Sequence, residues 1–293
     1  IRGLFPAEIN EDVIYYIGRA IVSFFEPRNV VVGKDMRTSS DCLEAALIKG
    51  IIDQGADVTK IGLATTPMVY HASGKLDTDI GIIITASHNP AEYNGLKMCR
   101  RQAVPIGEGA GMEEIKALAV NSSFKDAGPR GQVEENRNFR VEYLRHIRKF
   151  FEPAQANQKR KIVFDYANAM GVVDKEAFID MSDHIEAIHL FDQLDGTFPN
   201  HEANPLKLET LKDLKNKVVE TRADFGVAYD GDADRVGFID ETGEIVPMDY
   251  ITALIAKEIL KKHPGGLVLV DLRSSNAVKE YIEENGGKVD LCR

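Results

Sequence analysis

Short β-branched runs alternate with longer amphipathic stretches along the whole chain. The apolar runs predict strands at residues 30–32, 80–85, 161–164, 225–229 and 267–270. The amphipathic stretches predict helices at residues 11–24, 40–53, 139–151, 205–219 and 249–262. Asn10, one of Ser39 and Ser40, and Pro205 are residues typical of helix starts and support three of these helices. Such alternation is typical of repeated α/β domains with mixed, largely parallel sheets.

Three stretches share one pattern, in which an apolar strand is followed by a charged residue, a turn of small residues and a helix. They read NVVVGKDMRTSS, KIVFDYANAMG and LVLVDLRSSNA. A second strand follows each, in GADVTKIG, HIEAIHLF and GGKVDLC. Three copies of one βαβ-like unit would give this order. Other α/β proteins use the same order without internal repetition, so the pattern leaves triplication open.

Composition along the chain suggests where the units meet. Residues 121–136 are rich in Gly, Pro, Ser and charge, which is typical of a linker, and a second turn lies at residues 240–244. We therefore expect domain 1 at residues 1–135, domain 2 at 136–243 and an incomplete domain 3 at 244–293. The chain starts without methionine and stops in a strand-like segment, so we expect a fragment.

Charge and cysteine content limit the partners. The 36 basic and 46 acidic residues give a net charge of −10, which disfavours a nucleic-acid surface. No apolar run approaches the ~20 residues of a membrane span, so we expect no membrane partner. Cys42, Cys99 and Cys292 are widely spaced and form no C-x-x-C pair, which fits a reducing cytoplasm.

The first candidate site lies in GIIITASHNPAEYNGLK, residues 81–97. Ser87 follows a buried strand on a turn of small residues, where α/β folds bind ligands, so we expect it to be exposed as a nucleophile or phosphate carrier. His88 could reach it only if the turn brings the two together, because neighbours on a strand point to opposite faces. An ordinary polar turn shaped by Asn89-Pro90 is the simpler interpretation of these residues alone. No G-x-S-x-G is present, so a serine hydrolase is not supported.

The second candidate site lies in DFGVAYDGDADRVGFIDE, residues 224–241. Asp230, Asp232 and Asp234 alternate after an apolar strand, so their carboxylates could converge on Mg²⁺. A calcium loop fits poorly, because Arg235 stands where its sharp turn needs glycine. An aspartyl nucleophile and a solvated acidic turn remain alternatives.

A third stretch, GKDMRTSS, places Lys34 and Arg37 at a strand end just before a helix. This arrangement suits an anion, although an exposed basic turn is equally common.

TASHNP at residues 85–90 together with DGDADR at 230–235 resembles the α-D-phosphohexomutase family, in particular its phosphomannomutase/phosphoglucomutase subgroup. IRGLFPAEIN, GKDMRTSS, YNGLKM and FPNHEANPLKLETL extend the resemblance over nearly the whole chain. It implies an isomerase that interconverts hexose 1- and 6-phosphates through a phosphoserine at Ser87 and a hexose 1,6-bisphosphate, which also serves as activator. It further implies one Mg²⁺, held by Asp230, Asp232, Asp234 and a phosphate oxygen on Ser87.

The resemblance also assigns roles to basic residues. Lys97 and His88 match positions proposed for acid and base work, and the physics of phosphoryl transfer suits charge neutralisation by Arg37 and Arg235. Arg235 and, in the third unit, Arg273 are expected to bind the substrate phosphate.

Complete family members also carry a G-E-M-S-G-H-like sugar-recognition loop and a fourth, phosphate-binding domain, and neither is found here. The residues Tyr93-Asn94-Gly95 lean toward mannose or glucose phosphates over glucosamine phosphate. We expect a monomer or homodimer. The alternatives are a phosphoglucosamine mutase, or a non-catalytic module on the same fold that binds Mg²⁺ and sugar phosphates.

Overall fold

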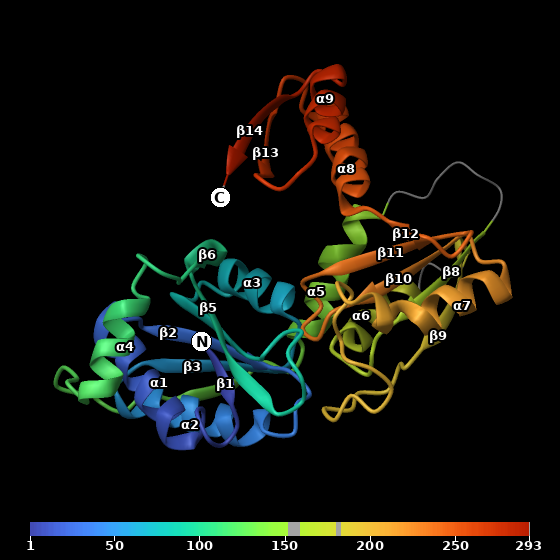
Figure 1. The fold of residues 1–293 in the computed structure, drawn as a ribbon. Helices are drawn as coiled ribbons and strands as arrows, with labels where there is room; N and C mark the ends of the chain where they lie inside the picture. The colour runs from blue at the N-terminus through green and yellow to red at the C-terminus, as the bar shows by residue number, and fades with distance from the viewer. Residues whose placement is uncertain (152–158, 180–182, 293) are drawn as a thin grey trace.

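Three α/β units follow one another along the chain in a computed structural model, which describes residues 1–151, 159–179 and 183–292 (Figure 1). The fold class expected from the sequence is confirmed, because each unit contains parallel strand pairs and the two larger sheets also contain antiparallel ones.

The first unit contains one sheet with the strand order β1-β5-β4-β2-β3-β7, and β6 pairs with β5. Its strands are β1 (Arg2–Leu4), β2 (Asn29–Lys34), β3 (Asp57–Leu63), β4 (Ile80–Ile84), β5 (Tyr93–Arg100), β6 (Val104–Pro105) and β7 (Val133–Glu135). Its helices are α1 (Glu11–Phe25), α2 (Ser40–Asp53), α3 (Thr66–Lys75), a 3-10 turn (Arg101–Ala103) and α4 (Met112–Asn121). β7 lies in the stretch that composition assigned to a linker. It forms because its backbone pairs in parallel with the free edge of β3.

The second unit has the strand order β12-β11-β10-β8-β9. Its strands are β8 (Arg160–Asp165), β9 (Ile185–Leu190), β10 (Phe225–Tyr229), β11 (Val236–Asp240) and β12 (Ile245–Val246). Its helices are α5 (Phe139–Ile147), a 3-10 turn (Arg148–Phe150), α6 (Gly171–Ile179), a second 3-10 turn (Leu208–Leu211) and α7 (Lys212–Thr221). Because β12 pairs with β11, this sheet extends past the boundary that we placed at residue 243.

The third unit is small and lies above the other two in the view, with the start of its helix α8 next to the second unit (Figure 1). It consists of α8 (Met248–Lys262), β13 (Leu267–Asp271), α9 (Asn276–Glu284) and β14 (Lys288–Cys292). Its two strands are parallel, as are β2 with β3 and β8 with β9 in the other units. The three stretches that share a sequence pattern therefore form the same βαβ arrangement.

The predicted strands are all present, and four of the five predicted helices begin within one residue of the expected start. Asn10 caps α1 as expected, by accepting a hydrogen bond from the amide of Val13 at 3.1 Å. The helix start at Pro205 was wrong, because α7 begins only at Lys212. The Thr210 hydroxyl donates to the carbonyls of Asn204 and Lys207, both at 2.8 Å, and these local bonds favour a turn over a helix.

Cap formation at α2 was also predicted wrongly. Ser39 stands at the cap position, but its side chain makes no cap hydrogen bond and accepts from Asn94 instead. The Ser40 hydroxyl donates to Asp35. Both hydroxyls are therefore committed to contacts around the carboxyl end of the first sheet.

The first two units share a hydrophobic core. Met68 on α3 and Ile83 on β4 pack with Phe139 on α5 and Met170 just before α6, and all four side chains are fully buried. A continuous core holds the two units in one relative position, because close-packed interiors resist deformation. Among the described residues, no helix has the length and apolar content to cross a lipid bilayer.

Candidate active site at the junction of the first two units

Ser87 lies three residues after β4, whose five residues are all buried. Its φ of 55° is in the left-handed region, which is strained for a residue with a Cβ. The amide of Ser87 donates to the Thr85 hydroxyl at 2.9 Å, which helps to hold this conformation. Ser87 itself is fully buried, so our expectation of an exposed serine was wrong. The loop of the second unit covers it, and Gly231 is so close that a Cβ there would lie 2.1 Å from the Ser87 carbonyl oxygen.

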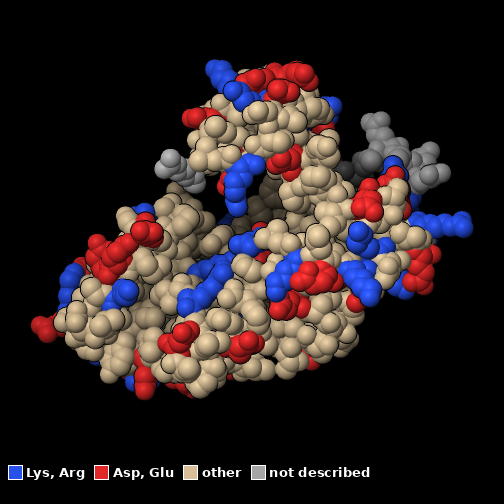
Figure 2. Space-filling model, in the orientation of Figure 1, with Lys and Arg blue, Asp and Glu red and all other residues tan. Residues whose placement is uncertain are grey.

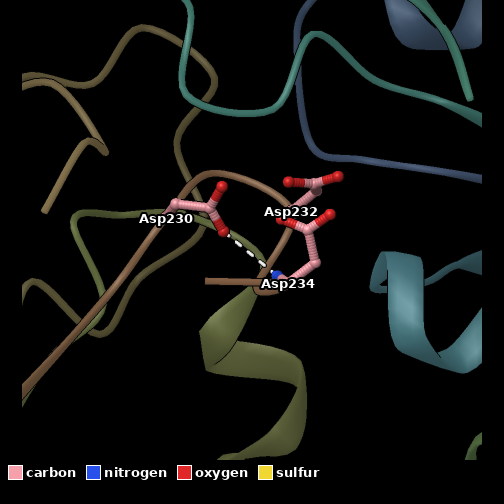
Figure 3. Close-up of side chains that lie close together, drawn as sticks. All are labelled: Asp230, Asp232 and Asp234. Atoms are coloured by element: carbon pink, nitrogen blue, oxygen red, sulfur yellow. Dashed lines mark hydrogen bonds between the residues drawn. The ribbon is translucent and has the colours of Figure 1, made fainter. Parts of the chain in front are cut away.

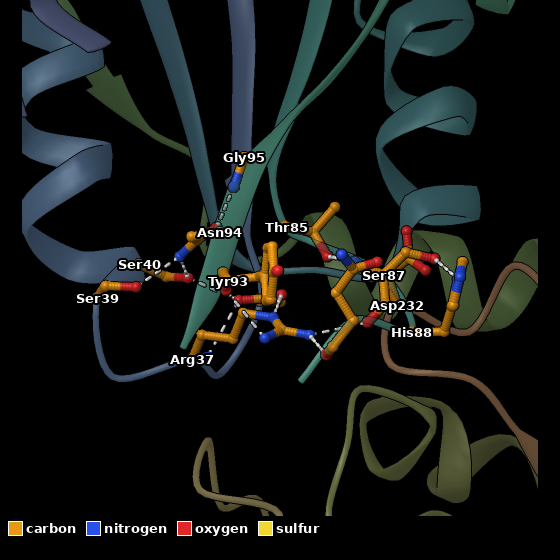
Figure 4. Close-up of polar contacts among 12 residues, drawn as sticks. Arg37, Ser39, Ser40, Thr85, Ser87, His88, Tyr93, Asn94, Gly95 and Asp232 are labelled. Carbon is orange, nitrogen blue, oxygen red and sulfur yellow. Dashed lines mark hydrogen bonds and ion pairs between the residues drawn. The ribbon is translucent and has the colours of Figure 1, made fainter. Parts of the chain in front are cut away.

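Arg37 lies beside the Ser87 loop and donates hydrogen bonds to its backbone (Figure 4). The guanidinium is almost fully buried, and its Nε donates to Asp35 at 3.2 Å. Its other N–H groups donate to backbone carbonyls of the loop, those of Pro90, Tyr93, Ser87 and Asn89. A guanidinium has five N–H groups, and here all five have a partner. This arrangement favours a loop-holding role for Arg37 over the expected contact with a phosphate.

Asp230, Asp232 and Asp234 lie on the loop between β10 and β11, and one carboxylate oxygen from each lies within 4.8 Å of the others (Figure 3). Asp230 and Asp232 are fully buried, whereas Asp234 is more exposed. Oδ1 of Asp230 accepts the amides of Asp234 and Arg235, both at 3.1 Å, and this shapes the loop. The three carboxylates therefore converge as the sequence predicted.

The serine loop and the aspartate loop are in direct contact. The Ser87 hydroxyl donates to Oδ2 of Asp230 at 3.0 Å. Lys97 on β5 reaches across, with its Nζ 2.5 Å from Oδ2 of Asp232 and 2.5 Å from Oδ2 of Asp234. Three predicted groups, the serine, the lysine and the aspartates, thus form one cluster built from two units.

The electrostatics of the cluster favour a bound cation. Burial and the neighbouring carboxylates raise the pKa of Asp230 to about 7. Burial alone would raise the pKa of Asp232, but the Lys97 ammonium lowers it, and the net direction is down. Oδ1 of Asp232 is buried without a hydrogen-bond partner, which is costly for a carboxylate oxygen. Three oxygen donors, one of them unpaired, fit a hard divalent cation such as Mg²⁺.

The alternative interpretations of the acidic loop gain less support. Both oxygens of Asp230 already accept hydrogen bonds, so this carboxylate is poorly placed as an aspartyl nucleophile. Burial of Asp230 and Asp232 also disfavours a solvated acidic turn.

His88 lies on the open side of the cluster. The turn brings its Nδ1 within 3.4 Å of the Ser87 hydroxyl, which strand geometry alone would not do. Arg235 places its Nη1 3.2 Å from the same nitrogen, and an N–H of arginine can only donate, so Nδ1 is an acceptor here. Burial, together with the positive charges of Arg235 and Arg2, lowers the pKa of His88. A neutral imidazole beside the serine follows.

Family profiles match both halves of this cluster. The profile described as "Phosphoglucomutase/phosphomannomutase, alpha/beta/alpha domain I" matches residues 1–126, and the corresponding domain II profile matches residues 141–243. The chain belongs to the phosphoglucomutase/phosphomannomutase family. The family resemblance drawn from TASHNP and DGDADR is thereby confirmed.

Curated relatives in this family cover almost the whole chain. A phosphomannomutase of Methanocaldococcus jannaschii is 36% identical over 98% of the chain and 63% of its own length. A phosphomannomutase/phosphoglucomutase of Pseudomonas putida is 38% identical over 98% of the chain and 61% of its own length. The chain therefore spans somewhat less than two thirds of these relatives.

A solved structure shows the same fold. The crystal structure of a phosphoglucomutase/phosphomannomutase family protein from Burkholderia thailandensis superposes with a TM-score of 0.91 at 30% identity. The match covers 100% of this chain and 64% of that one.

Two basic residues that we predicted as site residues lie outside the cluster of Ser87, Lys97 and the aspartates. Arg273 follows β13 in the third unit, pairs with Asp271, and has a side chain that is 91% exposed. Lys34 pairs with Asp41 and Glu44. Figure 2 shows a hollow between the third unit and the other two, with several basic side chains along its lower rim.

Two residues of the cluster were missed from the sequence. The Thr66 hydroxyl donates to Oδ2 of Asp232, and its amide donates to the Asp232 carbonyl at 3.0 Å. Arg2 donates to Oδ1 of Asn89 at 3.3 Å and adds positive charge near His88. The stretch IRGLFPAEIN pointed to Arg2, because it was one of the matches to the family, but nothing local marked Thr66.

Proposed function

We propose that this chain carries the phosphoryl-transfer centre of a Mg²⁺-dependent mutase that interconverts the 1- and 6-phosphates of mannose or glucose. The observation that carries the proposal is the contact between the Ser87 hydroxyl and Asp230, which joins the two family motifs in one buried cluster. The names of the relatives support the reaction class. Because the chain spans less than two thirds of their length, the complete activity is proposed as well.

Ser87 is proposed as the phosphate carrier. Its loop is held by Thr85, by Arg37 and by the close approach of Gly231, so the hydroxyl has one fixed position. A rigid position serves phosphoryl transfer, which depends mainly on positioning and charge neutralisation. Arg37 contributes by holding the loop, since all its N–H groups are already paired.

Asp230, Asp232 and Asp234 are proposed to hold Mg²⁺ together with an oxygen of the Ser87 phosphate. A phosphoserine carries a charge of about −1.5 to −2 at neutral pH, next to three carboxylates. When bound, the ion neutralises this charge and stabilises the transferring phosphoryl group.

Lys97 and His88 are proposed to handle the protons. Burial alone would lower the pKa of Lys97, but Asp232 and Asp234 raise it above its usual range, so Lys97 is protonated and is a weak acid as long as these two contacts persist. His88 is kept neutral and suited to accept a proton near Ser87. Arg235 faces solvent beside His88, where it could bind the phosphate of an incoming sugar.

Mannose or glucose 1,6-bisphosphate is proposed as the intermediate and activator, and Arg273 as a contact to the sugar phosphate across the hollow. The third unit contributes no other predicted group. A phosphoglucosamine mutase, or a module that binds Mg²⁺ and sugar phosphates without turnover, is the alternative that an experiment must exclude.

The test is the covalent state of Ser87. Incubation with glucose 1,6-bisphosphate and Mg²⁺ is expected to add about 80 Da to the intact mass of the chain. Ser87→Ala is expected to abolish the addition, while Ser123→Ala, at an exposed serine, should leave it unchanged. Conversion of mannose 1-phosphate to mannose 6-phosphate is followed in parallel by ³¹P NMR. Phosphorylation that persists in Ser87→Ala would refute the carrier, and saturable binding without any transfer would identify the non-catalytic module.

A further inference from the structure

Lys97 links the first two units by two ion pairs within the candidate site. It extends from β5 of the first unit, while Asp232 and Asp234 belong to the second. Its Nζ lies 2.5 Å from one oxygen of each carboxylate, and its side chain is only 18% exposed. An ammonium this close to two carboxylates, one of them fully buried, is a strong local counter-charge.

The same two carboxylates are the proposed ligands of the metal. Without any cation, three negative groups whose oxygens lie within 4.8 Å of one another would repel strongly. Lys97 is the ammonium that contacts two of them, and Thr66 supplies a hydroxyl to Asp232. No cation of the described residues is paired with Asp230, and one oxygen of Asp232 is buried without a hydrogen-bond partner, so the compensation is partial.

We propose that Lys97 is the internal counter-cation of the metal-free chain, and that its ammonium and a divalent ion occupy the Asp232–Asp234 carboxylates as competing alternatives. The inference rests on the Mg²⁺ site proposed above. When the ion binds, it neutralises the carboxylates of Asp232 and Asp234 that otherwise attract the Lys97 ammonium. Lys97 therefore becomes free for the incoming phosphate only when the metal is bound. Binding of the metal and release of the Lys97 ammonium from the carboxylates are then coupled.

Competition of this kind has two measurable consequences. Removing the ammonium should destabilise the metal-free chain, because the carboxylates lose their counter-charge. It should also strengthen Mg²⁺ binding, because the ion no longer has to displace a cation that lies against its ligands. A lysine that only orients the carboxylates for the metal predicts the opposite change in affinity.

The experiment compares the full chain with Lys97→Met, which keeps an unbranched side chain one atom shorter and without the charge. Lys49→Met is the control, because Lys49 pairs with Asp53 on the exposed face of α2, away from the cluster. Isothermal titration with MgCl₂ alone gives the affinity, and thermal unfolding in EDTA and in saturating Mg²⁺ gives the stability. Neither readout depends on turnover.

Lys97→Met is expected to bind Mg²⁺ at least about tenfold more tightly than the parent chain. Its unfolding temperature should fall in EDTA and recover in Mg²⁺, while Lys49→Met should behave as the parent in both. If Lys97→Met is already unfolded in EDTA, refolding on addition of Mg²⁺ supports the inference in the same way. Lys97→Arg, which keeps the charge, should retain the parent's stability in EDTA.

Equal or weaker Mg²⁺ affinity in Lys97→Met would overturn the inference, as would an equal loss of stability with and without the ion. Asp232→Asn separates this failure from that of the proposed function. If Mg²⁺ stabilises the parent chain but not Asp232→Asn, the metal site stands and only the competition is refuted. If Mg²⁺ binds neither the parent nor Lys97→Met, the metal site and the inference fail together.

Discussion

Gly231 is the position where a single added methyl group should separate the serine loop from the aspartate loop. An added Cβ would lie 2.1 Å from the Ser87 carbonyl oxygen and 2.9 Å from its carbonyl carbon. An ordinary carbon–oxygen contact is about 3.3 Å or longer, so the loops must move apart by about 1 Å. The obstacle is backbone, which Arg37 holds, so no side chain can turn away to make room.

Gly231→Ala is therefore expected to slow phosphoryl transfer far more than it destabilises the fold. A misplacement of about 1 Å costs on the order of 10²-fold in rate, whereas overpacking costs about 1–3 kcal/mol of unfolding free energy. The assay mixes the chain with glucose 1,6-bisphosphate and Mg²⁺, quenches at set times, and measures Ser87 phosphorylation by intact mass. Denaturation in urea gives the free energy of unfolding.

Gly74→Ala is the matched control, because a Cβ at Gly74 on α3 meets no atom within 4 Å. It should leave the transfer rate unchanged and stabilise the fold by up to about 1 kcal/mol. The reasoning is refuted if folded Gly231→Ala phosphorylates Ser87 within about threefold of the parent rate, since the contact between the loops would then not set the geometry of transfer.

Two further substitutions test the electrostatics of the fold. Arg37→Met leaves Asp35 buried without its cation and removes the guanidinium donors of four loop carbonyls, of which that of Pro90 keeps the Tyr93 amide as a donor. We therefore expect a loss of about 3–5 kcal/mol in the free energy of unfolding measured by urea denaturation, and a loss near zero would show that the loop does not depend on Arg37. Burial raises the pKa of Asp174 to about 7 from 3.8, with Arg140 acting against the shift, and one Asp174 oxygen has no hydrogen-bond partner. A raised carboxyl pKa gives stability that is present below pH 3.8 and is lost as the pH rises through about 7. Asp174→Asn should therefore gain about 2 kcal/mol relative to the parent between pH 5 and pH 8, and an unchanged difference across this range would contradict the assignment.

Local sequence patterns were enough to predict the βαβ strands of each unit and the two motif loops, but not edge strands such as β7. The run Ile82-Ile83-Ile84 is short, β-branched and bounded by turn residues, which favours a buried strand, and both it and Phe225–Tyr229 are strands in the structure. These predictions succeed because the period of apolar residues is a property of neighbours in the chain. The helix start at Pro205 failed because hydrogen bonds of Thr210 to nearby carbonyls favour a turn there. The expected cap bond of Ser39 failed because its hydroxyl bonds to Asn94, which lies 55 residues away and outside any local pattern.

The sequence by itself determined the family, the βαβ order of each unit and the residues that could carry a phosphate and a cation. Only the tertiary structure decided what those residues touch. Ser87 became buried and Arg37 became a support for its loop, while Lys97 was directed to the carboxylates of another unit. The physical reason is that a guanidinium, an ammonium or a hydroxyl bonds to whichever group packing brings within about 3 Å. Between Lys97 and Asp234 that partner is 137 residues away in the chain, and the shared core of the first two units brings it close.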